Sequence, residues 1–266
     1  MFHEMKPILR QGIGLLLVGV CAAVWVLTTG MARRELRTRT CQGKGKLQVT
    51  VTDSLERRFV AKADVQDWLE KEYGAYAGLP LDSVDLTRIE KLICSHSAVR
   101  EAEAWITDDG VLHVALSQRE PVIRLENGQN ACYADETGYL FPLQARGSVS
   151  VPVVSGKLPF DVPKGFKGYL ENPEQALWLS RVISLVSYMR GKVWEKDIRK
   201  LTVLPDGELV LYPVQGREEF LFGPPVRIEE KFKLLTTYYR SIAPSKDPGY
   251  YGKVDLRYRK QVVCKK

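Results

Sequence analysis

Histidine and cysteine, the residues that most often bind metals or act as nucleophiles, are scarce in this chain. Its 266 residues include three histidines and five cysteines. No two cysteines form a C-x-x-C pair, so neither a zinc ribbon nor a thioredoxin-like redox site is supported. The odd number and wide spacing favour free or buried thiols over a disulfide framework. We therefore expect no metal site and no cofactor. The five cysteines are Cys21, Cys41, Cys94, Cys132 and Cys264.

The sequence also lacks a strong imbalance of charge. It has 39 Lys and Arg against 32 Asp and Glu, a formal net charge of +7 at pH 7. Basic side chains are interspersed with acidic ones, as in Lys62-Ala-Asp64. Nucleic-acid-binding domains usually gather basic and aromatic residues on one surface, and this sequence shows no such cluster. We therefore expect no nucleic-acid partner. A basic stretch between Arg33 and Lys46 favours contact with anionic lipid headgroups.

Sequence motifs for catalysis are missing as well. The chain contains no GxxxxGK[ST] phosphate loop, no HExxH and no GxSxG. Asp135-Glu136 precedes Gly138 and is better explained as a solvated turn than as a catalytic carboxylate pair. We expect no catalytic residue and no small-molecule substrate. The competing hypothesis, an envelope hydrolase, requires a cleft that holds two or more of four residues: His113, Asp135, Glu136 and Asp161.

A long run without charged residues is present near the N-terminus. Between Arg10 and Arg33 nearly all residues are apolar or small. At about 1.5 Å of rise per residue, a helix of this length crosses a hydrocarbon core of roughly 30 Å. We predict a single transmembrane helix over residues 11–32, preceded by a short leader at 1–10 and followed by a linker at 33–46. The lipid bilayer is then a partner of this helix.

Two questions about this segment stay open at the level of the residues. Two basic residues precede the run and four arginines follow it, which by the positive-inside rule would keep the body in the cytoplasm. Long domains, however, translocate largely regardless of flanking charge. A cleaved signal peptide is the second interpretation, with Lys6 and Arg10 before the apolar region and a poor cleavage site at Gly30-Met31-Ala32.

The residues after the linker alternate between strand and helix patterns. Residues 47–51 have the period of a strand, and residues 63–73 have that of a helix. A second helix follows Asp82 and Asp85, and Asp109-Gly110 is a hairpin signal between two alternating runs. The predicted order over 47–118 is strand, helix, helix, strand, strand. The expected core residues of its helices are Trp68, Leu69, Leu86, Ile89, Leu92 and Ile93.

After Pro121 the pattern becomes rich in strands. One helix begins at the capping sequence Asn172-Pro173-Glu174-Gln175 and ends at Gly191, and another covers residues 228–242. The body is therefore an α+β protein that ends in a mixed β-rich domain, 119–266, with two flanking helices. Alternating runs predict its strands at 122–125, 131–134, 139–141, 151–155, 198–204, 208–212, 219–222, 251–258 and 261–264.

Several short motifs follow one another along the body. The helix Val84-Asp-Leu-Thr-Arg-Ile-Glu-Lys-Leu92 and the hairpin after it resemble a POTRA domain, a small β-α-α-β-β module of envelope proteins. With the motifs that follow, the body resembles the FtsQ (DivIB) family of bacterial cell-division proteins. Those motifs are Gln118-Arg-Glu-Pro-Val-Ile-Arg124, Tyr133-Ala-Asp-Glu-Thr-Gly-Tyr-Leu-Phe141, Val151-Pro-Val-Val-Ser-Gly156 and Val254-Asp-Leu-Arg-Tyr258.

The resemblance implies a membrane-anchored scaffold without catalysis, which docks other divisome proteins at the septum. It implies a cytoplasmic leader and a body on the periplasmic side of the inner membrane. It also implies that the FtsB component of an FtsB–FtsL coiled coil pairs with the last strand, which we expect at Val254–Val263 on a sheet edge. Tyr258 is equally compatible with packing inside the sheet. A POTRA-type translocation component is a further alternative. The implied contact residues are Arg257, Tyr258, Arg259, Lys260, Gln261 and Val262.

Overall fold

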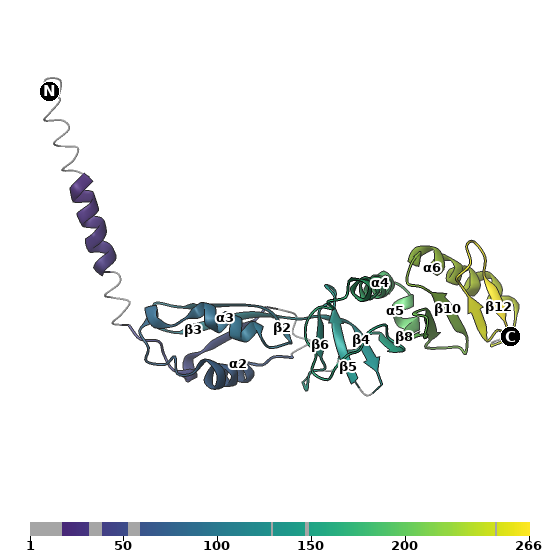
Figure 1. Cartoon of the computed structure of the whole chain (residues 1–266), viewed down its shortest axis with the longest axis horizontal. Coiled ribbons are helices and arrows are strands. Elements are labelled where there is room, and N and C mark those ends of the chain that lie inside the picture. The colour runs from purple at the N-terminus through teal and green to yellow at the C-terminus, as the bar shows by residue number, and fades with distance from the viewer. Residues whose placement is uncertain (1–17, 32–38, 53–58, 129, 147–148, 248) are drawn as a thin grey trace, which may run out of the picture. The chain divides into compact units, whose positions relative to one another are not determined.

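The computed structural model describes residues 18–31, 39–52, 59–128, 130–146, 149–247 and 249–266 (Figure 1). The body divides into two compact units. The first ends at Ser117, and the second runs from Gln118 to Lys266 and includes Phe59.

A helix covers residues 18–31, inside the apolar segment predicted at 11–32. Its large side chains are exposed, and the hydroxyls of Thr28 and Thr29 donate to backbone carbonyls one turn earlier in the helix. Among the described residues, no helix is both long enough and apolar enough to span a bilayer. The rest of the predicted span, the predicted leader and part of the predicted linker lie outside the described residues.

The described part of the first unit has the predicted β-α-α-β-β order. Three strands form its sheet in the order β1-β3-β2, with β1 parallel to β3. Asp85 caps the second helix by accepting a hydrogen bond from the backbone N–H of Arg88 at 2.9 Å. The elements are β1 (Gln48–Val51), α2 (Lys62–Trp68) with its π-helical continuation η2 (Leu69–Tyr73), α3 (Leu86–Cys94), β2 (Val99–Ile106) and β3 (Leu112–Gln118). Single 3-10 turns lie at η1 (Lys44–Lys46) and η3 (Leu81–Ser83).

The core of the first unit differs in part from the predicted set. Leu69, Ile89 and Ile93 are fully buried, as expected. Leu86 and Leu92 are only half-buried, because they flank the stripe that Ile89 and Ile93 form one helical turn apart. Trp68 is also half-buried, and its ring stacks on His96 with centroids 3.6 Å apart.

Within the described residues of the second unit, nine strands form one mixed sheet. Their order is β12-β11-β10-β9-β8-β7-β4-β5-β6. The pairs β4–β7, β7–β8 and β10–β11 are parallel and the others antiparallel. The strands are β4 (Pro121–Asn127), β5 (Asn130–Asp135), β6 (Leu140–Pro142), β7 (Val153–Gly156), β8 (Ile198–Val203), β9 (Leu209–Pro213), β10 (Glu219–Gly223), β11 (Lys253–Asp255) and β12 (Val263–Lys265).

Two main helices pack on this sheet. Asn172 caps the first by accepting from the N–H groups of Glu174 and Gln175 at 2.9 and 3.4 Å, which confirms the predicted start. Val182 of the first helix and Phe232 of the second are buried in the same core as the sheet strands. A four-residue helix before β8 was not predicted. The helices are α4 (Pro173–Met189), α5 (Trp194–Asp197) and α6 (Ile228–Thr237), which continues as the π-helical turn η4 (Tyr238–Ile242) and the 3-10 turn η5 (Ala243–Ser245).

The predicted last strand, Val254–Val263, is wrong in its bounds. The structure has two short strands, β11 and β12, joined by residues 256–262, which agrees with the two runs predicted at 251–258 and 261–264 although both observed strands are shorter. The chain leaves the strand where the carboxylate of Asp255 accepts a hydrogen bond from the backbone N–H of Arg257 at 3.0 Å. It then turns at Lys260, whose φ of 57° is a left-handed conformation. The predicted contact residues therefore lie in a connection between strands instead of along one.

Candidate partner-binding site

The edge strand β12 is the outermost described strand at one side of the nine-stranded sheet. On its inner neighbour β11, the N–H of Leu256 donates to Leu221 O at 3.0 Å, so the residues that alternate with Asp255 face β10. Gly252, which precedes β11, accepts from Glu219 N and donates to Lys265 O of β12, both at 2.9 Å. Lys253 and Asp255 face the other way, toward β12, where Asp255 pairs with Val263 and Lys253 with Lys265. Because backbone direction alternates along a strand, the N–H and C=O of Cys264 point away from the sheet.

The opposite edge of the same sheet is covered. Leu140 of β6 exchanges two backbone hydrogen bonds with Gly168, at 2.8 and 2.9 Å. No described segment bonds to the outer side of β12 in the same way. Since unpaired edge groups are the template for strand addition, β12 is the edge of this sheet that can accept a partner strand.

The side chains of β12 and its neighbours are apolar on the face toward the core and basic on the exposed surface. Cys264 is half-buried against the core, beside its fully buried cross-strand neighbour Val254. Burial raises the pKa of the Cys264 thiol, which keeps it protonated at neutral pH. Lys253, Lys265 and Lys266 are exposed at the end of the hairpin. A strand carrying acidic side chains therefore suits this edge better than a basic one.

A buried carboxylate fixes the start of the 256–262 connection. Asp255 is 5% exposed and accepts hydrogen bonds from Arg257 Nε at 3.0 Å and Nη2 at 2.7 Å. The other terminal nitrogen of Arg257 lies 2.9 Å from Glu208 Oε2, in the turn before β9. Burial raises the pKa of Asp255, but the hydrogen bonds from Arg257 outweigh it and hold this pKa below its ordinary value. The same bonds raise the pKa of Arg257. The guanidinium thus joins β11 to the turn that precedes β9.

Two further basic residues, Arg227 and Lys231, make contacts near the start of the same connection. Arg227 Nη2 donates to the backbone carbonyl of Arg257 at 2.7 Å. Lys231 is 1% exposed, and its ammonium donates to Pro224 O at 2.7 Å and lies 4.4 Å from the ring centre of Phe222. Burial, with a smaller contribution from Arg227, lowers the pKa of Lys231 to about 8.

The structure brings the six predicted contact residues together in the 256–262 connection, beside β12. The structure leaves five of them exposed, and Val262 packs half-buried against the core. Arg257 is occupied by Asp255 and Glu208, whereas Tyr258 presents 47% of its surface to solvent. The exposed group is Arg257, Tyr258, Arg259, Lys260 and Gln261.

The four residues named for a hydrolase do not form a reactive site in the described parts of the chain. Asp135 is the last residue of β5, directly before the predicted turn, but its carboxylate is buried instead of solvated. One oxygen accepts from Thr137 Oγ1 and from the N–H groups of Thr137 and Tyr139, and the other lies 2.8 Å from Arg119. His113 belongs to the first unit, where its ring stacks on Trp105. Among the described residues, no cluster of three or more His, Cys, Asp or Glu could hold a metal ion.

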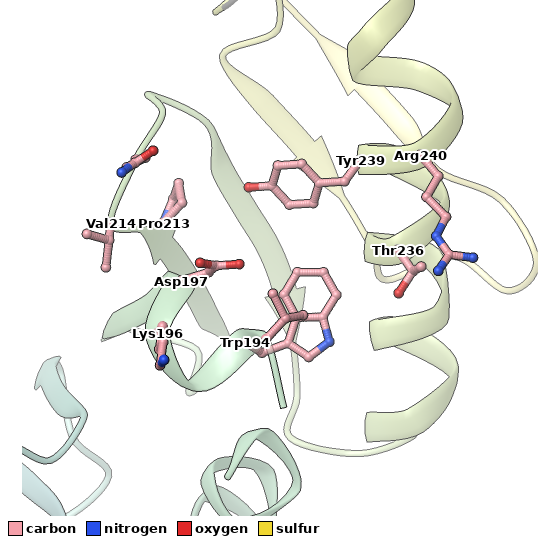
Figure 2. Close-up of a pocket in the computed structure, with 10 residues that line it drawn as sticks. Trp194, Lys196, Asp197, Pro213, Val214, Thr236, Tyr239 and Arg240 are labelled. Atoms are coloured by element: carbon pink, nitrogen blue, oxygen red, sulfur yellow. The ribbon is translucent and has the colours of Figure 1, made fainter. Parts of the chain in front are cut away.

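A pocket of about 720 Å³ in the second unit was missed by the sequence analysis. It lies between α5, the end of β9 and the π-helical turn η4 (Figure 2). Its walls come from three segments that are far apart in the sequence, so no local sequence motif predicts it. Trp194 and Asp197 come from α5, Pro213 and Val214 from the end of β9, and Tyr239 and Arg240 from η4.

The chain thus combines a POTRA-like unit with a β-rich unit whose described sheet has one uncovered edge, at β12. Comparison with known families agrees with this architecture. The POTRA-like domain matches residues 40–117, and the family described as FtsQ/DivIB, C-terminal related, matches residues 120–265. The second match covers more than half of the chain, which therefore belongs to the FtsQ/DivIB family. The resemblance inferred from the motifs is confirmed.

A curated relative supports the same assignment. The chain is 26% identical over 199 residues to the cell division protein FtsQ of Rhodothermus marinus. The aligned region covers 71% of this chain and 68% of that protein. The similarity therefore extends across both units and supports a role in cell division.

Proposed function

We propose that this protein is a membrane-anchored division scaffold without catalysis, whose β12 edge accepts a strand from an FtsB-like subunit of an FtsB–FtsL coiled coil. The observation that carries the proposal is the outward-pointing backbone of Cys264 on an uncovered edge, in a chain of the FtsQ/DivIB family. The absence of a catalytic role is supported by the full set of hydrogen bonds around the Asp135 carboxylate.

The proposal includes the organisation of the whole chain. Residues 1–10 form a cytoplasmic leader, residues 11–32 an anchor in the inner membrane and residues 33–46 a linker. The POTRA-like domain, 47–118, and the β domain, 119–266, stand on the periplasmic side. Alkaline phosphatase, which is active only outside the cytoplasm, should be active when fused after Lys266. Activity of a cytoplasm-only reporter at the same position would contradict this topology.

The docking edge is tested by two proline substitutions in neighbouring positions of β12. Cys264→Pro removes an N–H that points outward, and Val263→Pro removes one that faces Asp255 in the ladder with β11. We expect Cys264→Pro to abolish capture of purified FtsB–FtsL by the full chain while the circular dichroism spectrum is retained. Val263→Pro should also loosen β12 itself, seen as faster hydrogen exchange in β11. Cys264→Ala, which keeps the backbone donor, is the matched control and should bind normally.

Two results would place the interface elsewhere. One is undiminished capture by Cys264→Pro, and the other is undiminished capture by a folded chain that ends at Val262 and so lacks β12. The exposed ring of Tyr258 adjoins this edge in the sequence and is proposed as a side-chain contact, with Arg257, Arg259, Lys260, Gln261 and Val262 around it. Tyr258→Ala should then weaken capture without changing stability.

A further inference from the structure

The rings of Trp194 and Tyr239 form the bottom of the pocket beside η4, here called its aromatic floor, and both pack on core side chains. Trp194 is 9% exposed, and its ring centre lies 5.7 Å from that of Phe232 in the core. The ring of Tyr239 lies 5.7 Å from Phe220 and 6.0 Å from Trp194. Figure 2 shows both rings and the carboxylate of Asp197 facing the same space. A guest side chain entering here would therefore meet apolar surface below it.

The rim of the pocket exposes aliphatic side chains. Val193 is 63% exposed and Val214 is 55% exposed, and Pro213 lies next to Val214 in the lining. Single exposed valines are ordinary on protein surfaces. Two of them on the rim of one aromatic pocket form a collar that would exclude water around an inserted side chain, as at the centres of protein interfaces.

Some cations near this pocket form ion pairs and others do not. On α6, Lys233 forms an ion pair with Glu229 at 2.9 Å, and Arg227, the residue before this helix, forms one with Glu230 at 3.4 Å. Lys196 and Arg240, both in the lining, have no ion pair among the described residues. Asp197 is the single carboxylate among the lining residues, and the Glu218 carboxylate near Tyr239 accepts a hydrogen bond from the Tyr238 hydroxyl at 3.2 Å. The rim therefore offers an arriving ligand two cations that have no ion pair among the described residues.

The phenol of Tyr239 supplies a directional polar group. Burial, then the nearby carboxylates of Glu218 and Asp197, raise its pKa to about 12. The hydroxyl therefore stays protonated at physiological pH and can donate a hydrogen bond. The π-helical turn that carries Tyr239 and Arg240 is a type of helix irregularity often found at functional sites.

We propose that this pocket is a second docking site, separate from β12, for a segment of a partner protein that inserts a large apolar side chain and carries a carboxylate beside it. The aromatic floor and valine collar receive the apolar anchor. Lys196 and Arg240, which lie on opposite sides of the opening in Figure 2, each offer a cation to the flanking carboxylate. The pocket volume of about 720 Å³ exceeds that of one side chain and leaves room for the neighbouring residues of the segment.

Selection with a random dodecapeptide library displayed on phage tests the proposal on the full 266-residue chain. The library is first depleted against Val214→Asp, which places a charge in the collar. Enriched peptides should share a large apolar residue within two positions of Asp or Glu. Their synthetic forms should bind the wild-type chain in fluorescence polarisation and lose at least tenfold in affinity for Val214→Asp. The matched control is Leu177→Asp, at a position on α4 that is 51% exposed, and it should bind as the wild type does.

Charge reversal tests the second half of the proposal. The double variant Lys196→Glu/Arg240→Glu should bind the acidic peptides at least tenfold more weakly and regain affinity for versions whose Asp and Glu are replaced by Lys. The proposal is overturned if no peptide distinguishes wild type from Val214→Asp, if enriched peptides lack acidic residues, or if charge reversal leaves affinity unchanged. Capture of FtsB–FtsL by Val214→Asp should be normal, which separates this site from the β12 edge.

Discussion

Removal of the Arg257 guanidinium tests whether the Asp255 cluster holds the C-terminal hairpin in place. In Arg257→Ala, the carboxylate of Asp255 keeps the backbone N–H of residue 257 but loses Nε and Nη2 as donors. Glu208 loses its partner at the same time. The Asp255 side chain is 6% exposed, so water cannot readily replace the lost donors.

The size of the effect follows from the exposure of the two partners. Removing one member of a fully buried ion pair costs about 3–5 kcal/mol. The side chain of Arg257 is 40% exposed, so its charge is partly solvated in the native state and the Coulomb part is screened. We expect a loss of about 2–3 kcal/mol in the free energy of unfolding at pH 7. Arg259→Ala, at an exposed position with no ion pair among the described residues, should change it by less than about 0.5 kcal/mol.

The loss should also depend on pH. In the wild type the pKa of Asp255 lies below its ordinary value, so the stabilisation is present at neutral pH and is lost as pH falls through that folded-state pKa. In Arg257→Ala burial remains but the side-chain hydrogen bonds and the charge of Arg257 are lost, so the pKa of Asp255 should rise relative to that in the wild type. The variant then gains relative stability on acidification. The difference between the two proteins should therefore be largest at pH 7 and shrink below about pH 4.

Urea unfolding followed by fluorescence measures this difference, and hydrogen exchange of β9 to β11 assigns it to the second unit. A change below about 0.5 kcal/mol at pH 7 would show that the cluster contributes little. A loss that stays the same from pH 7 to below about pH 4 would show that it arises from packing of the Arg257 stem instead of from the charge on Asp255.

Three further changes test the core, a buried cation and a strand end. Ile93→Ala should destabilise the first unit by about 2–5 kcal/mol in thermal or urea unfolding, and Leu92→Ala, which is only half-buried, should cost clearly less. Between pH 8 and 10.5 the stability of the wild type should increase relative to that of Lys231→Met, because Lys231 loses its buried charge in the native state first, as compared by urea midpoints. Gly156→Ala should destabilise by more than about 1 kcal/mol in the same assay, because its φ is 102° and the added Cβ would collide with the carbonyl oxygen of Val203.

Local signals in the sequence were sufficient for the elements that are defined by neighbouring residues. The Asn172 cap and the 3.6-residue period located α4, and the alternating pattern with Asp109-Gly110 located the hairpin of β2 and β3. The helix α5 was not predicted, because its four residues are too few to show a helical period and its start has no side-chain cap. Trp68 was placed too deep, because its surface partner His96 lies far along the chain.

The candidate site depends on long-range contacts, which sequence patterns do not record. Nothing in Val254–Val263 shows that Asp255 will turn back to bind Arg257, or that Lys260 will adopt a positive φ. The alternating runs at 251–258 and 261–264 did indicate two strands, but the single edge strand expected at Val254–Val263 is divided by this turn. The pocket was invisible for a related reason, since α5, β9 and η4 meet only in the folded unit.

The shortness of β12 limits what strand addition alone can contribute to the proposed docking. One outward N–H and one outward C=O at Cys264 supply about 0.5–1.5 kcal/mol net for each hydrogen bond. A micromolar complex requires about 8 kcal/mol. The remainder has to come from side chains next to the edge, such as Tyr258 and the lysines at the hairpin end, or from tethering both partners to one membrane, which raises their effective concentration. The shortness of β12 and its lysines also limit unspecific pairing, because short edges rich in lysine resist pairing with unrelated strands.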